Sequence, residues 1–133
     1  MANEAVIIEL FDGGRPIRFT CADDTGIEKG TILKLSDPRT ASASSADNDP
    51  FAGIAAAEKV ANDGELSISG YTCGIFDILT AGAITVGATV NISTANTVNA
   101  SAAADLLTGS VVGKALEACA GAEVIAVAVG VYQ

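Results

Sequence analysis

Apolar and polar side chains alternate along several short stretches of this chain. The stretches I-R-F-T at residues 17–20 and E-L-S-I-S at 65–69 alternate cleanly. In the apolar C-terminal stretch 123–132, bulky and small side chains alternate with the same period of two. Glycine-containing turns separate such stretches. A period of two residues bounded by glycine turns is typical of half-buried β-strands. The pattern predicts an all-β protein built of short strands.

Two alanine-rich segments allow either a strand or a helix. F-A-G-I-A-A-A-E-K-V at residues 51–60 and V-V-G-K-A-L-E-A-C-A at 111–120 both show apolar residues at helical spacing. Each carries an early glycine, which costs roughly 1 kcal/mol inside a helix, and each is short enough to be marginal as a helix. A glycine turn and a strand-like stretch follow both segments. We predict strands here, with helix as the alternative.

The two halves of the chain also resemble each other. Three segments of the first half recur in the same order in the second half: 29–36 with 86–93, 51–58 with 111–118, and 65–71 with 123–132. Either internal duplication of one β unit or a chance likeness explains this pattern.

Residues 36–50, S-D-P-R-T-A-S-A-S-S-A-D-N-D-P, contain two prolines and no large apolar side chain. Such a segment buries too little surface to offset its ordering entropy, so a long, exposed polar loop is predicted. Residues 1–20 form an N-terminal arm or a first hairpin in this interpretation. Residues 21–133 form a single β domain.

The C-terminal stretch is apolar on both faces. The bulky face consists of Ile125, Val127, Val129 and Val131, and the small face consists of Val124, Ala126, Ala128 and Gly130. A strand of this kind lies inside a sandwich or against another subunit. The small face is therefore a candidate oligomer interface, and a central core strand is the alternative.

Charge and cysteine content narrow the function classes. The formal net charge is −9, and Lys114 is the one basic residue beyond position 60, so we expect no nucleic-acid partner. Cys21, Cys73 and Cys119 have no C-x-x-C spacing, which favours reduced thiols in a soluble protein made in the cytoplasm. No apolar stretch reaches the length of a membrane span.

The sequence offers little for catalysis or metal binding. There is no histidine, which excludes Ser-His-Asp and Cys-His catalysis in their usual forms. The oxygen-rich segments 23–28 and 47–49 lack the spacing of a calcium loop and are interpreted as solvated turns. We therefore expect no enzyme, no cofactor and no metal site.

Several of these segments carry a family resemblance. K-G-T-I-L-K-L-S, F-A-G-I-A-A-A-E, G-E-L-S-I-S, G-I-F-D-I and V-V-G-K-A-L-E-A together resemble the small capsid cement or decoration proteins of tailed phages and related viruses. The resemblance covers roughly residues 26–131. The chain departs from the family pattern in its 36–50 loop and its longer N-terminus, so contacts made there cannot be carried over.

The resemblance implies a compact β-barrel or tulip-like sandwich fold. It also implies a virion protein on the outside of an icosahedral capsid, where it stabilises contacts between major capsid subunits, commonly as a homotrimer. The N-terminal segment is apolar and lies outside the repeat, which makes it the candidate capsid-binding element. Its candidate residues are Val6, Ile7, Ile8, Leu10, Phe11, Arg15 and Arg18. A tail or baseplate module, or a bacterial surface β domain, is the alternative function.

Overall fold

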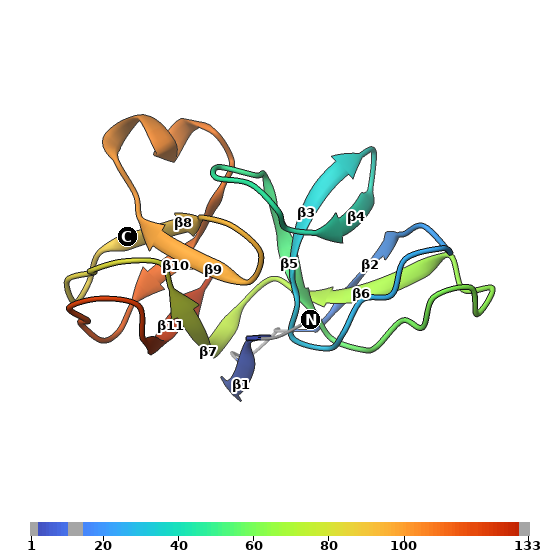
Figure 1. Ribbon diagram of the computed structural model, residues 1–133, viewed down its shortest axis with the longest axis horizontal. Helices are drawn as coiled ribbons and strands as arrows, with labels where there is room; N and C mark the ends of the chain where they lie inside the picture. The colour runs from blue at the N-terminus through green and yellow to red at the C-terminus, as the bar shows by residue number, and fades with distance from the viewer. Residues whose placement is uncertain (1–2, 11–14, 131–133) are drawn as a thin grey trace.

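The computed structural model describes residues 3–10 and 15–130, which form two closed five-stranded β-barrels lying side by side (Figure 1). The first barrel consists of β2 (Ile17–Thr20), β3 (Ile32–Asp37), β4 (Thr40–Ala43), β5 (Phe51–Ala55) and β6 (Ser67–Tyr71). The second barrel consists of β7 (Gly74–Thr80), β8 (Thr89–Ile92), β9 (Thr97–Ala100), β10 (Val111–Ala115) and β11 (Val124–Val129). The predicted all-β barrel class is confirmed. That residues 21–133 act as a single domain stays a prediction.

The two barrels have the same strand order. The first closes as β2-β4-β3-β5-β6 and the second as β7-β9-β8-β10-β11. In each barrel the first strand runs parallel to the third in sequence, and every other pairing is antiparallel. An isolated bridge joins Ile27 to Lys59 in one half and Ile84 to Cys119 in the other. The recurring segments of the sequence thus fold as two copies of one β unit.

The alanine-rich segments form strands, as predicted, over Phe51–Ala55 and Val111–Ala115. Their early glycines are required by the barrel, because neighbouring strands approach closely there. A Cβ at Gly53 would lie 2.8 Å from the carbonyl oxygen of Tyr71, and one at Gly113 would overlap the carbonyl oxygen of Ala128. The glycines that disfavour a helix therefore also permit the tight strand contact.

The prediction of a long loop over residues 36–50 is wrong where β3 and β4 lie, over residues 36–37 and 40–43, while residues 44–50 lie outside the strands. β3 continues to Asp37, and β4 closes the first barrel after a turn in which Arg39 takes a positive φ of 54°. Ala41 and Ser44 are buried at 1% exposure. The small side chains of T-A-S-A leave no strong apolar pattern in the sequence, yet small size is what the interior of a narrow barrel accommodates.

The barrels share part of their core. Ile32 and Ile54 of the first barrel belong to the apolar cluster of the second. The buried Asn96 side chain of the second barrel accepts a hydrogen bond from the N–H of Ile32 at 2.9 Å. The N–H of Phe51 donates to the carbonyl oxygen of Gly109 at 2.9 Å. Apolar contact and backbone hydrogen bonds therefore join the two units.

The first two strands do not pair with each other, which corrects the alternative of an N-terminal hairpin. β1 (Val6–Glu9) adds to β7 of the second barrel, while β2 lies between β4 and β6 of the first. A local turn cannot account for this arrangement, because β1 pairs with residues about seventy positions away. In the described part of the chain, no helix is long and apolar enough to cross a bilayer.

Candidate functional site

β1 is an extra strand on the outside of the second barrel, next to β7 (Figure 1). It pairs antiparallel, with Val6 opposite Asp77 and Ile7 opposite Phe76, and the register shifts before Glu9. Among the described strands, β1 has a neighbour on one side only. A strand with one unpaired edge can accept a further strand from a partner protein.

Two glycines make room for this N-terminal segment. The N–H of Ala5 donates to the carbonyl oxygen of Gly30 at 2.6 Å, and a side chain on Gly30 would overlap the carbonyl oxygen of Ala5. At Gly74, a Cβ would lie 2.8 Å from the carbonyl oxygen of Glu9. Gly30 precedes β3 of the first barrel and Gly74 begins β7 of the second, so the segment contacts both units.

The predicted capsid-binding residues are mostly exposed, but they do not share one element. Four of them lie on β1 or directly after it, and we call them the β1 surface. Their exposed fractions are 60% for Val6, 37% for Ile7, 53% for Ile8 and 38% for Leu10. Arg15 and Arg18 are also exposed. Arg18 lies on β2 in the first barrel, where its carbonyl oxygen accepts a hydrogen bond from the Arg39 side chain at 3.4 Å. Phe11 lies outside the described residues.

The predicted oligomer residues lie on the outer side of β11, with Gly130 directly after it. Val124 is exposed, Ala126 is half-buried and Ala128 is buried. The alternate residues Ile125, Val127 and Val129 belong to the second barrel's core. β11 lies between β7 and β10, so the prediction of a central core strand is confirmed for Ile125, Val127 and Val129, while Val131 lies outside the described residues.

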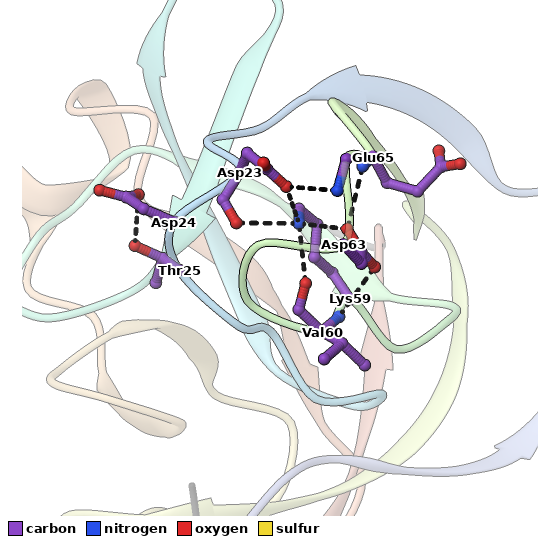
Figure 2. Close-up of polar contacts among 8 residues, drawn as sticks. Asp23, Asp24, Thr25, Lys59, Val60, Asp63 and Glu65 are labelled. Carbon is purple, nitrogen blue, oxygen red and sulfur yellow. Dashed lines mark hydrogen bonds and ion pairs between the residues drawn. The ribbon is translucent and has the colours of Figure 1, made fainter.

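Lys59, which lies between β5 and β6, is at the centre of a group of polar contacts (Figure 2). Its side chain is 2% exposed, and its ammonium contacts the Asp63 carboxylate at 2.7 Å and the Asp23 carboxylate at 3.1 Å. It also donates to the carbonyl oxygens of Asp23 and Val60. The Asp23 carboxylate in turn accepts the N–H of Gly64 at 2.9 Å. We call Lys59, Asp23 and Asp63 the lysine cluster.

The hydrogen bonds and ion pairs of the lysine cluster favour the charged forms of Lys59 and Asp63. Burial alone would lower the pKa of Lys59, but the hydrogen bonds and charges of Asp63 and Asp23 raise it above its ordinary value. The hydrogen bond from Lys59 holds the pKa of Asp63 below its ordinary value. At neutral pH all three side chains are therefore charged, and their ion pairs hold two loops together. The sequence offers only a weak signal for this cluster, the i,i+4 spacing of Lys59 and Asp63.

The other chemical candidates from the sequence have structural roles. Asp49, in the oxygen-rich segment 47–49, accepts the N–H groups of Ser45 and Ala46 and lies 3.5 Å from the Lys34 ammonium. Across residues 3–10 and 15–130, no three acidic, cysteine or histidine side chains are placed to hold a metal ion. The three cysteines are free thiols, and burial raises the pKa of Cys21.

A family model described as phage cement protein matches residues 11–131, a range that includes both barrels. The chain belongs to the phage cement protein family. No curated protein matches it. Membership implies a non-enzymatic structural protein of the virion that associates with capsid proteins and stabilises the capsid. In this cement protein the matched range begins after β1, so the strand with the free edge lies outside the matched residues.

Proposed function

We propose that this cement protein decorates the outside of an icosahedral capsid and stabilises the contacts between major capsid subunits. The observation that carries the proposal is the β1 surface, an unpaired strand edge with three exposed apolar side chains on the strand and a fourth, Leu10, directly after it. Soluble proteins usually protect such edges, because they invite pairing with other chains. Its partner in this account is an edge strand of the major capsid protein.

The mechanism is mechanical. Internal pressure strains the contacts between capsid subunits, and a protein bound across them adds buried apolar area. Each Å² of buried apolar surface contributes about 25 cal/mol to the free energy of binding, but the entropy lost when the two proteins associate offsets much of this gain. Many copies bound around one shell therefore contribute more than any single contact.

Charge supports the outer position. With a net charge of −9 the protein does not attract the packaged nucleic acid. The exposed Arg15 and Arg18 can pair with acidic groups of the capsid. In the same account the copies assemble as homotrimers through the side of β11 that carries Val124, Ala126 and Ala128. Family membership supports a capsid role over a tail or surface module.

Addition to finished heads tests the outer position. Purified protein is mixed with DNA-filled heads that lack it, and the bound copies are counted after sedimentation. We expect saturable binding, because the contact sites face outward once the head is closed. Binding to open, immature shells alone would contradict decoration of the exterior.

A further inference from the structure

Two arginines from neighbouring parts of the first barrel lie close together on its outside. Arg18 belongs to β2, and Arg39 lies in the turn between β3 and β4, directly before the first residue of β4. The Nε–H of Arg39 donates to the carbonyl oxygen of Arg18 at 3.4 Å, which brings the Arg39 guanidinium onto β2. Both residues are exposed. We call them the arginine pair.

The arginine pair has no compensating acid. The chain contains 16 acidic and 7 basic residues, yet neither guanidinium forms an ion pair with any residue in the ranges 3–10 and 15–130. The residue opposite Arg18 on β6 is Ser69, which carries no charge. Two like charges held close together repel each other, so the pair is stabilised by negative charge that a partner brings.

Arg39 adopts a backbone conformation that an arginine does not favour. Its φ is 54°, in the left-handed region that glycine and asparagine usually occupy. The equivalent residue of the second barrel is Asn96, which directly precedes β9 and has a φ of 58°. Asn96 is buried and accepts the N–H of Ile32, whereas the Arg39 residue is exposed. The turn therefore carries an arginine at an energetic cost, and such costs are common at functional sites.

The second barrel shows that the fold requires neither arginine. The buried Phe19 of β2 corresponds to the buried Ile78 of β7, because each lies one residue before the parallel pairing with the third strand of its barrel. The residues before them are Arg18 and Asp77, so the equivalent position carries opposite charges in the two barrels. The second barrel closes with an acid and an asparagine at these two places. Folding therefore does not account for the arginine pair.

The arginine pair is separate from the β1 surface. β1 adds to the second barrel, whereas β2 and the turn between β3 and β4 belong to the first (Figure 1). The apolar core that the barrels share holds the two surfaces in a fixed relation. One copy therefore presents two surfaces of different chemistry, an apolar strand edge and a pair of cations.

We propose that the arginine pair is a second capsid contact, which binds carboxylates of the major capsid protein. This inference rests on the proposed function and adds Arg39, which no local sequence pattern connects with Arg18. A guanidinium suits a carboxylate, because its planar fork donates two parallel N–H bonds to the two oxygens. Since the two surfaces lie on different barrels, one copy holds the capsid at two separate places without any contact between copies.

Replacing the two arginines tests this contact while preserving the fold. Arg39→Asn places in the turn the residue that the second barrel has there, so we expect an unchanged or higher urea midpoint. Binding to shells without DNA is then measured by sedimentation over a concentration series. We expect Arg18→Gln/Arg39→Asn to bind about tenfold more weakly than the wild type, with a smaller dependence on salt concentration. Arg39→Lys keeps the charge and is expected to bind more tightly than Arg39→Asn.

Lys114→Gln is the matched control for the single variants, because it removes one positive charge from β10 of the second barrel. It is expected to bind as the wild type does. Equal binding of the wild type and the double variant overturns the proposal and leaves the proposed function standing, whereas a wild type that binds no shells overturns both.

Two further results identify a different partner and also overturn the proposal. If the arginines matter only for shells that contain DNA, the partner is nucleic acid. If the double variant changes the mass of the free protein in light scattering, the partner is another copy of the chain. We expect neither result, so the double variant should have the mass of the wild type and should bind more weakly to empty shells.

Discussion

The N–H of Ala5 donates a hydrogen bond to the carbonyl oxygen of Gly30 at 2.6 Å, which anchors the start of the chain on the first barrel. The next residues then pair with β7 of the second barrel. The N-terminal segment therefore joins the two units and at the same time presents the β1 surface. Its anchor, its pairing and its exposed side chains can be tested separately.

Replacing Gly30 by alanine tests the anchor. Gly30 has a φ of +90°, and an added Cβ overlaps the carbonyl oxygen of Ala5. We expect the free energy of unfolding to fall by about 1–3 kcal/mol, with faster amide exchange in Val6–Glu9. Urea unfolding and hydrogen exchange measure the two effects. Gly82→Ala is the control, because a Cβ there meets no atom within 4 Å. Equal stability of both variants would contradict the anchor.

Removing the ammonium of Lys59 tests the lysine cluster. Lys59→Met leaves Asp23 and Asp63 facing each other without a cation, so the protein loses stability. We expect a lower urea midpoint with an unchanged slope. The exposed Lys29→Met serves as the control and is expected to shift the midpoint little. A midpoint equally insensitive to both changes would show that the cluster contributes nothing to stability.

The same groups set the pH limits of stability. The pKa of Asp63 is lowered below 3.8 by the hydrogen bond from Lys59. Its contribution is complete above pH 3.8 and is lost as the pH falls through the lower folded pKa. The pKa of Lys59 is raised above 10.5, so its contribution is complete below pH 10.5 and is lost as the pH rises through the higher folded value.

Urea midpoints across the pH range measure these losses. The wild type is expected to lose stability at both extremes. Lys59→Met should show a smaller alkaline loss and a smaller acid loss, because Asp63 no longer has its cation. Parallel curves for the two proteins would contradict this account of the lysine cluster.

A charge on the β1 surface tests capsid binding. Ile8 is 53% exposed, so Ile8→Asp should leave the fold intact, yet it places at the proposed contact a charge that binding would have to remove from water. We expect binding to capsids to weaken by about tenfold or more. Val60→Asp, at a 65% exposed position of the first barrel, is the matched control. Equal binding of both variants would exclude the β1 surface as the contact.

The strands that the sequence predicts well are those whose side chains alternate strongly. In β6 Ile68 lies between two serines, β11 carries bulky residues at every second position, and the glycines of β5 and β10 disfavour a helix. β4 escapes prediction because T-A-S-A contains no large apolar side chain, and its burial depends on the barrel around it.

Long-range partners could not be predicted from local pattern. Nothing near Val6 indicates that it pairs with Asp77 rather than with β2. The burial of Lys59 likewise depends on Asp23, which lies thirty-six positions earlier. Sequence analysis did identify the N-terminal segment and the small face of β11 as surfaces of interest. Their placement on the same barrel follows only from the pairing of β1 with β7.

The rupture temperature of capsids, measured together with the number of bound copies, tests the central claim most directly. Shells with and without the protein are heated, and release of their contents is followed while bound protein is counted by quantitative electrophoresis. The account predicts a fixed ratio of cement protein to major capsid subunits and a higher rupture temperature that rises with occupancy. Saturated shells that rupture at the same temperature as bare ones would contradict it.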